Sequence, residues 1–374
     1  GKALPVMMDV TQKDSIKEVV NSKPYKDSLD AKSNKFKIMN VLFGYSHQNS
    51  FKHSSWSISA PINGIQFNTV EGWLGNVGFD YRTYNDSLHT SSKIWTNLRY
   101  GFSSKQPYFK LGASHRFNAT NRLYISVEGG KYISQFNSDN PISPLVNGIY
   151  TLFREENYMK LYEKTYLKAK LNRELTNGIR LYSEIEYAQR QSLQNAENLP
   201  KPLRDREAVD YTSNNPINSD ETRPFFDKYN SLLLTTSLEF RIGQKYQTRP
   251  NYKVNMGSKY PLLAIYYQKG IPTIGNSTTD FDFLKLIAKD EVNIGIFGKA
   301  QYYLGYGMFL SDKNLPFIDY KHFNTSQTIF ASTGLRSFYL LPYYERSTNE
   351  NFFEGHFEQH FNGFIFNKIP LLKK

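Results

Sequence analysis

The chain has 374 residues, and its 46 Lys and Arg against 34 Asp and Glu give a formal net charge of +12. Aromatic residues make up 16% of it, which excludes extensive disorder, and no run approaches the ~18 apolar residues of a membrane-spanning helix. The absence of cysteine excludes disulfides, Cys-ligated zinc and a thiol nucleophile. A membrane β-barrel shows lipid only every second side chain, so this polar composition still allows a membrane protein.

Residues 1–33 are expected to form a polar lead-in segment, with a helical turn within 12–20. The sequence opens Gly1-Lys-Ala-Leu-Pro5, without an initiator Met or a signal peptide, so we expect the numbering to begin inside a longer precursor. The remainder, residues 34–374, is expected to form one domain.

A hydrophobic period of two dominates this domain and predicts β-strands. In 231–242, for example, Leu234 and Leu238 alternate with Thr235 and Glu239. The same opposition of an apolar and a charged face is found in 107–117, 121–132, 164–175 and 178–190. Further strands are expected at 36–47, 54–69 (as two short strands), 73–84, 92–102, 259–269, 279–290, 293–309, 335–346 and 351–366.

Strand length favours a membrane barrel over a soluble sandwich. Most of these segments have about ten residues or more, the length of a membrane-spanning strand, whereas strands of soluble proteins average ~5–6 residues. Short turns such as 118–121 and 176–178 contrast with a long polar loop at 191–229, as in outer-membrane barrels. The predicted fold is therefore all-β, a transmembrane antiparallel β-barrel of about 12–16 strands, with a polar lumen crossed by Arg/Lys–Glu pairs.

One segment departs from the strand pattern. Apolar residues at helical spacing predict a short helix near 149–162. Aromatic residues gather near strand ends, where amphipathic rings suit the two membrane–water interfaces, as in the group Trp73, Trp95, Tyr100 and Phe102.

The richest polar group of the sequence is Glu354, His356, Glu358 and His360, which period two places on one strand face opposite Phe353, Phe357 and Phe361. Two histidines and two carboxylates are metal-ligand types. However, side chains at i and i+2 on a strand stand about 7 Å apart, too far for two ligands of one ion. We therefore interpret the group as a polar cluster facing the lumen, and we expect no metal, no cofactor and no catalytic residue.

The other candidate motifs indicate structure and not chemistry. Residues 68–73 (Asn-Thr-Val-Glu-Gly-Trp) are expected to form a tight turn, and 295–298 lacks the Lys-Ser/Thr of a phosphate loop. His53 adjoins Ser54, but neighbours on a strand point to opposite faces. The basic residues are dispersed and form no stripe of the kind that binds nucleic acid.

Several stretches resemble a Bacteroidota outer-membrane family of uncharacterised function. They are 68–73, 108–112 (Tyr-Phe-Lys-Leu-Gly), 150–162 and the C-terminal 358–374, and the resemblance runs from about residue 34 to the C-terminus. It implies a barrel distantly similar to BamA/TamA-type assembly proteins, often preceded by a carboxypeptidase-regulatory-like domain, which we do not expect within residues 1–374. In the family further strands follow the Lys368-Ile-Pro-Leu-Leu372 segment, so the barrel either continues past Lys374 or closes differently. The BamA-type Arg-Gly-Phe/Tyr motif has a loose counterpart in 335–339, with Ser337 in place of Gly.

The expected function is a non-enzymatic role in envelope biogenesis or transport, as an accessory subunit of a larger assembly in the outer membrane. The expected partners are outer-membrane lipids and other outer-membrane or periplasmic proteins, not nucleic acid. Three alternatives remain open. They are a passive or substrate-specific channel, a barrel enzyme with a nucleophile–base pair at its rim, and a soluble glycan-binding β-sandwich whose apolar strand faces would point inward.

Overall fold

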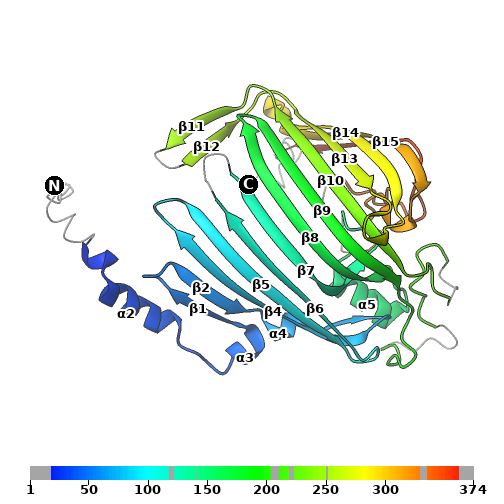
Figure 1. The fold of residues 1–374 in the computed structure, drawn as a ribbon, viewed down its shortest axis with the longest axis horizontal. Helices are drawn as coiled ribbons and strands as arrows, with labels where there is room; N and C mark the ends of the chain where they lie inside the picture. The colour runs from blue at the N-terminus through cyan, green and yellow to red at the C-terminus, as the bar shows by residue number, and fades with distance from the viewer. Residues whose placement is uncertain are drawn as a thin grey trace, which may run out of the picture.

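The computed structural model describes residues 18–117, 122–139, 141–203, 210–218, 223–249, 252–328 and 335–361. Antiparallel strands dominate, and fourteen of them form one sheet in the order β1-β2-β4-β5-β6-β7-β8-β9-β10-β13-β14-β15-β16, with β3 paired to β4 (Figure 1). The first strands are β1 (Tyr45–Asn49), β2 (Ser54–Ile58), β3 (Gln66–Asn68), β4 (Gly72–Asn85), β5 (Thr90–Gly101), β6 (Gln106–Arg116), β7 (Tyr124–Gln135) and β8 (Leu161–Thr176). The sheet continues with β9 (Ile179–Ser192), β10 (Tyr229–Arg241), β13 (Leu262–Gly270), β14 (Asp280–Asn293), β15 (Lys299–Asn314) and β16 (Phe352–His360).

Short elements surround the sheet. β11 (Lys245–Arg249) and β12 (Tyr252–Gly257) form a separate hairpin between β10 and β13. The helices are α2 (Lys23–Ser33), α3 (Asn40–Phe43), α4 (Pro61–Gly64) and α5 (Pro144–Arg154), with 3₁₀ turns η1 (Ile274–Asn276), η2 (Gly295–Phe297) and η3 (Phe317–Asp319). Within the described residues, none of the helices is long and apolar enough to cross a membrane.

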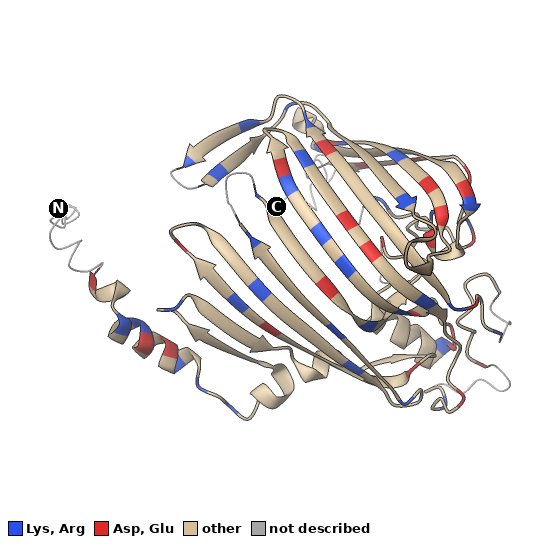
Figure 2. Cartoon of the chain, in the orientation of Figure 1, with Lys and Arg blue, Asp and Glu red and all other residues tan. Residues whose placement is uncertain are grey.

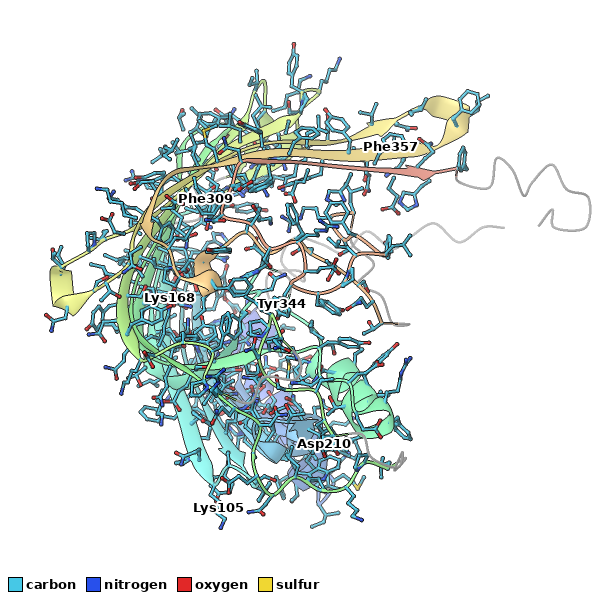
Figure 3. All side chains as sticks on the ribbon, turned by 90° about the vertical axis from the view of Figure 1, so that its right-hand side faces the viewer. Lys105, Lys168, Asp210, Phe309, Tyr344 and Phe357 are labelled. Carbon is cyan, nitrogen blue, oxygen red and sulfur yellow. The ribbon has the colours of Figure 1, made fainter. Side chains whose placement is uncertain are left out.

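The sheet is strongly curved and open. Seen along the strands it forms a deep hollow, with Tyr344 inside it (Figure 3). Within the described ranges, the edge strands β1 and β16 each pair on one side only and are not joined to each other. The antiparallel all-β class and the expected strand number are confirmed by this fourteen-stranded sheet, whereas no closed barrel is formed by the described residues.

The two faces of the sheet differ as period two predicts. Cross-strand pairs such as Ile185↔Leu234 and Leu286↔Tyr306 place apolar residues on the convex face. Many of them are exposed: Leu167 by 60% and Phe357 by 70%. Others on this face are Val77, Phe79, Ile94, Leu98, Phe109, Leu111, Val127, Ile185, Leu263, Ile265, Leu286, Leu304, Tyr306 and Phe353.

The two ends of the sheet also differ. At one end, here called the short-turn end, strands are joined by 86–89 and 177–178 and by the β11–β12 hairpin. Gly178 has φ +83°, and a Cβ there would lie 2.4 Å from the Arg241 carbonyl oxygen, so this turn requires glycine. At the long-loop end lie the connections 136–160, 193–228 and 315–351, the last of which we call the inner segment.

The expected helix at 149–162 was misplaced. α5 begins earlier, with Pro144 in its first turn, and ends where Glu155 takes a left-handed φ of +58°. The following chain is extended, and Asn147 Oδ1 accepts hydrogen bonds from the Tyr158 and Met159 amides at 2.9 and 2.8 Å. The apolar residues at 161 and 162 therefore open β8 and do not belong to the helix.

Two expected strands were wrong and one hairpin was missed. Residues 36–47 hold α3 and only the start of β1, because Gly44 turns the chain with φ +80°. Residues 335–346 form turns in the inner segment, where aromatic residues that mimic a strand pattern pack into the hollow. The β11–β12 hairpin was missed because its residues are nearly all exposed and lack an apolar face.

The 191–229 loop is not a free surface loop. Its first and last residues belong to β9 and β10, and Asn214, only 3% exposed, lies against the start of β8. Asn214 Oδ1 accepts from the Leu161 amide at 2.8 Å, and Nδ2 donates to the carbonyls of Leu161 and Leu193 at 2.6 and 2.8 Å. Part of this connection is thus fixed to the sheet.

The lead-in region holds a helix that is tied to the sheet. The Asp30 carboxylate of α2 accepts hydrogen bonds from the Ser50 amide and hydroxyl, both at 2.6 Å. Residues 1–17, the turn at 118–121 and the C-terminal 362–374 lie outside the described residues, so the expectations for them are not tested.

Candidate functional site

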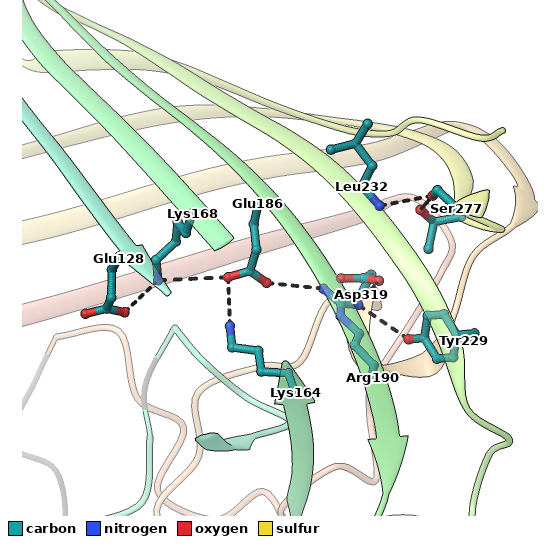
Figure 4. A network of polar contacts seen from close by, with 10 residues as sticks. Glu128, Lys164, Lys168, Glu186, Arg190, Tyr229, Leu232, Ser277 and Asp319 are labelled. Atoms are coloured by element: carbon teal, nitrogen blue, oxygen red, sulfur yellow. Dashed lines mark hydrogen bonds and ion pairs between the residues drawn. The ribbon is translucent and has the colours of Figure 1, made fainter. Parts of the chain in front are cut away.

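A network of charged side chains runs across the concave face of β7, β8 and β9 (Figure 4). Strand register creates it, because Glu128 lies opposite Lys168 and Lys168 lies opposite Glu186. Lys168 Nζ is 3.7 Å from Glu128 and 3.9 Å from Glu186, and Lys164 Nζ is 2.7 Å from Glu186. Basic and acidic residues are visible side by side along the middle strands (Figure 2), and the measured distances confirm the Lys/Arg–Glu pairs expected on this face.

The most deeply buried part of the network joins the sheet to the inner segment. Arg190 of β9 and Asp319 of η3 are 3% and 5% exposed, and their closest nitrogen and oxygen are 2.6 Å apart. Arg190 also lies 3.9 Å from Glu186 and donates a 3.4 Å hydrogen bond to the Tyr229 hydroxyl. Buried charges are tolerated only when paired and hydrogen-bonded, so this contact fixes η3 against the sheet.

Aromatic packing surrounds this ion pair. Ile318 and Tyr344 of the inner segment pack with Phe136 and Tyr162 at the long-loop ends of β7 and β8. The rings of Phe136 and Tyr162 meet edge to face at 5.5 Å between centroids. Nearby, Lys321 Nζ lies 3.7 Å from Asp139. The inner segment thus fills much of the hollow at this end.

Two cavities remain between the inner segment and the sheet. One, of about 600 Å³, is lined by Lys164, Lys168, Glu186 and Asp319. The other, of about 310 Å³, is lined by Lys285, Tyr303, His322 and Arg336 among others. Both cavities are polar, and they adjoin each other, because their linings share Asp139, Tyr266 and Asp319.

A histidine–serine contact occurs inside the inner segment. His322 Nδ1 lies 2.7 Å from Ser347 Oγ, while Ser347 Oγ donates to the Tyr344 carbonyl at 2.8 Å. Burial, reinforced by the Lys321 charge, lowers the pKa of His322 to about 4, so the ring is neutral at pH 7. Since the hydroxyl proton points to a carbonyl and His322 Nε2 is buried without a hydrogen-bond partner, the arrangement is that of a structural contact.

The predicted cluster of Glu354, His356, Glu358 and His360 does lie on the concave face of β16, while Phe353 and Phe357 are exposed on the other. Its members do not converge on one point. Glu354, 6% exposed, is ion-paired with Lys285 of β14. His356 packs on the Phe338 ring at 4.5 Å, and Glu358 pairs with His360 at 2.8 Å.

The described residues contain no group of three or more His, Cys, Asp or Glu with the geometry to hold a metal ion. The contacts formed by the cluster on β16 are ion pairs and ring packing. Arg336, from the loose counterpart of the Arg-Gly-Phe/Tyr motif, lies in the inner segment with its guanidinium 5.4 Å from the Tyr303 ring centroid.

Residues 68–73 form the tight β3–β4 turn that the sequence predicts, but they also anchor their surroundings. Glu71 is fully buried and ion-paired with Arg99. Thr69 Oγ1 accepts a 2.8 Å hydrogen bond from Asn157 Nδ2, just beyond α5. His53, next to Ser54, pairs instead with Asp86 at 2.9 Å.

Arg190 and Asp319 were not identified from the sequence. Arg190 was placed on a charged strand face, but nothing in the sequence indicates which of the many acidic residues it meets. Asp319 lies in a connection of 37 residues, outside the stretch of it that was predicted as a strand, 335–346. A buried ion pair between a strand and a distant connection leaves no pattern among neighbouring residues of the sequence from which it could be predicted.

Residues 39–374 match a family of unknown function, DUF5686, over its C-terminal domain. This range agrees with the extent of the resemblance noted in the sequence. No curated protein matches the chain significantly.

Proposed function

The chain belongs to the DUF5686 C-terminal-domain family, and we propose that it is an integral outer-membrane β-barrel protein with a non-enzymatic role in envelope biogenesis or transport. Within that role it would act as an accessory subunit of a larger assembly, in contact with outer-membrane lipids. The observation that carries the proposal is the contrast between an exposed apolar face and a buried, ion-paired face on one long sheet.

The apolar face is much larger than a soluble monomer usually exposes. Exposed large hydrophobic residues occur on nearly every long strand, from Phe79 on β4 to Phe357 on β16. Isolated patches of a few hundred Å² are normal on soluble proteins, whereas a continuous band marks a protein or membrane interface. Strands of 9 to 16 residues over β4–β10 and β13–β16 also have the length that spans a bilayer.

Aromatic residues at the long-loop rim add to this argument. Trp73, Tyr100 and Phe102 project from the convex side of β4 and β5 and are 43%, 41% and 61% exposed. Rings of this kind are enriched where a barrel meets the headgroup region.

The soluble glycan-binding sandwich lacks support. It would need two packed sheets with apolar faces turned inward, whereas these apolar faces are exposed on a single sheet. A channel would need a continuous aqueous path, and among the described residues the inner segment packs into the hollow at the long-loop end. We therefore favour an assembly role over passive conduction.

Two measurements test the proposal. Protein extracted from bacterial membranes should partition with the outer membrane and migrate faster in SDS before boiling than after. A soluble protein without this shift would contradict the membrane role. In planar bilayers the purified chain should show no steady ion conductance, and a stable open conductance would favour the channel.

A further inference from the structure

A second site, far from the inner segment, lies in the hollow at the short-turn end. Here a cavity of about 620 Å³ is lined by four basic side chains, those of Arg116, Arg122, Arg180 and Lys253, together with Tyr84, His89, Tyr124, Asn172 and Tyr252. Among the described residues, no acidic side chain is part of this lining. A second cavity of about 890 Å³ adjoins it and shares Tyr84, Arg116 and Tyr124.

The β11–β12 hairpin forms one wall of this site. Its Tyr252 packs edge to face on His89 of the β4–β5 turn, 5.2 Å between centroids, and its Lys253 carbonyl accepts a 3.2 Å hydrogen bond from Arg122. Curvature of the sheet thus brings residues from β4 to β12 around one space. The hairpin has no apolar face to pack against the sheet, and it forms a wall of the cavity instead.

Two of the four cations have a carboxylate within 4.0 Å, and the other two have none at that distance among the described residues. Glu174 lies 2.7 Å from Lys253 and 4.0 Å from Arg122. Arg180 donates to the Tyr182 hydroxyl at 2.9 Å and lies between Glu174 of β8 and Glu239 of β10 in the strand register, although no ion pair within 4.0 Å is found for Arg180 or Arg116 among the described residues. Guanidinium groups that no carboxylate contacts directly keep N–H groups that can bind a phosphate in bidentate fashion.

The adjoining cavity supplies a different chemistry. Its wall carries many hydroxyl and amide groups, from Ser46, Gln48, Asn49, Ser50, Ser54, Ser55, Thr83, Ser91, Ser92 and Ser114. Lys26, Arg82 and Lys93 add positive charge, which Asp80 offsets in part at 2.9 Å from Arg82 and 4.0 Å from Lys93. Hydroxyl-rich walls beside tyrosine rings suit the hydroxyl groups and apolar ring faces of a sugar.

We propose that the two cavities together bind a phosphorylated glycan, with a phosphate held by Arg116 and Arg180 and the sugar along the serine-rich wall. The ligand is either free or the headgroup of a glycolipid. The proposal depends on the cavities alone and not on the membrane role proposed above.

The test is calorimetric titration of the full-length chain in detergent with glucose 1,6-bisphosphate, glucose and pyrophosphate. Binding of the bisphosphate is expected, weakened at least about tenfold in the R116Q/R180Q variant because two charge-assisted contacts are lost. Glucose is expected to bind far more weakly. If no bisphosphate binds, or if pyrophosphate binds as tightly, the assignment to a phosphorylated glycan is overturned.

R173Q is the matched control, because Arg173 is exposed on the opposite face of β8, next to Asn172 of the cavity wall. It should bind like the unchanged chain, and an equal loss in R173Q would overturn the proposal. Both variants are first checked for an unchanged circular-dichroism spectrum and unfolding midpoint, so a folding defect is separated from lost binding. Titration with a diphosphorylated glycolipid in mixed micelles distinguishes a lipid headgroup from a free glycan. If the glycolipid binds more tightly than glucose 1,6-bisphosphate, the ligand is a lipid headgroup. If it binds more weakly, the ligand is a free glycan.

Discussion

The ion pair between Arg190 and Asp319 should govern how firmly the inner segment is held. Replacing Asp319 with Asn keeps the shape of the side chain but leaves Arg190 charged and 3% exposed. Removing one partner of a buried pair costs ~3–5 kcal/mol. Because Glu186 remains 3.9 Å from Arg190 and offsets part of this loss, we expect D319N to cost about 3 kcal/mol.

The double variant R190M/D319L separates the energetic contribution of the ion pair from that of side-chain packing. Glu186 keeps Lys164 at 2.7 Å when Arg190 is removed, so no buried carboxylate is left alone. Apolar replacement of a buried pair is often neutral, and the double variant should recover about 2 kcal/mol relative to D319N. The control E184Q breaks the half-exposed Lys170–Glu184 pair and should cost less than about 1 kcal/mol.

Urea titration in detergent, followed by tryptophan fluorescence, gives the free energies of unfolding. Hydrogen exchange over 315–328 reports on the inner segment itself. Exchange there should accelerate in D319N and return toward the original rate in the double variant. The reasoning fails if D319N costs no more than E184Q, or if the double variant is as unstable as the sum of its single changes.

Three further changes have defined outcomes. The pKa of His322 is about 4 when it is buried and ~6.5 when it is exposed, so the docked inner segment binds fewer protons than the undocked one. Docking therefore weakens as the pH falls from ~6.5 toward 4, by about 2 kcal/mol at pH 5. In H322Q, the pH dependence of hydrogen exchange in the inner segment should be smaller. N214A leaves the Leu161 and Leu193 backbone groups unpaired and should cost about 2–3 kcal/mol in urea titration, while a loss below ~0.5 kcal/mol would contradict the docked loop. L234R on the convex face should lower the free energy of unfolding in lipid by roughly 2–4 kcal/mol if that residue lies near the bilayer midplane. T235R on the concave face should lower it far less. Equal losses would reverse the assignment of the two faces.

The sheet was predictable because its signal is local. Alternation in segments such as 231–242 assigns each side chain to a face, and the register confirms that Leu234 and Thr235 lie on opposite sides. The turn at 176–178 was recognisable for the same reason, since Gly178 is required by its own backbone conformation. Such features depend on a few consecutive residues.

The contents of the hollow could not be predicted, because they depend on contacts between distant parts of the chain. Tyr343 and Tyr344 look like strand residues in sequence, yet they pack against Tyr158 and Phe136 in turns of the inner segment. The four cations of the short-turn site come from β6, β9, the connection before β7 and the β11–β12 hairpin, and they appeared dispersed in the sequence. Their convergence follows from the curvature of the sheet, which strand periodicity does not specify.

The claim that the convex apolar face contacts lipid can be measured directly, since the chain has no cysteine to remove. Single cysteines in place of Leu167 on the convex face and Lys168 on the concave face would carry nitroxide labels in protein reconstituted into vesicles. The account predicts that the label at 167 collides preferentially with oxygen, which concentrates in the bilayer, and the label at 168 does not. Equal access of a water-soluble nickel reagent to both positions would contradict the membrane-embedded sheet.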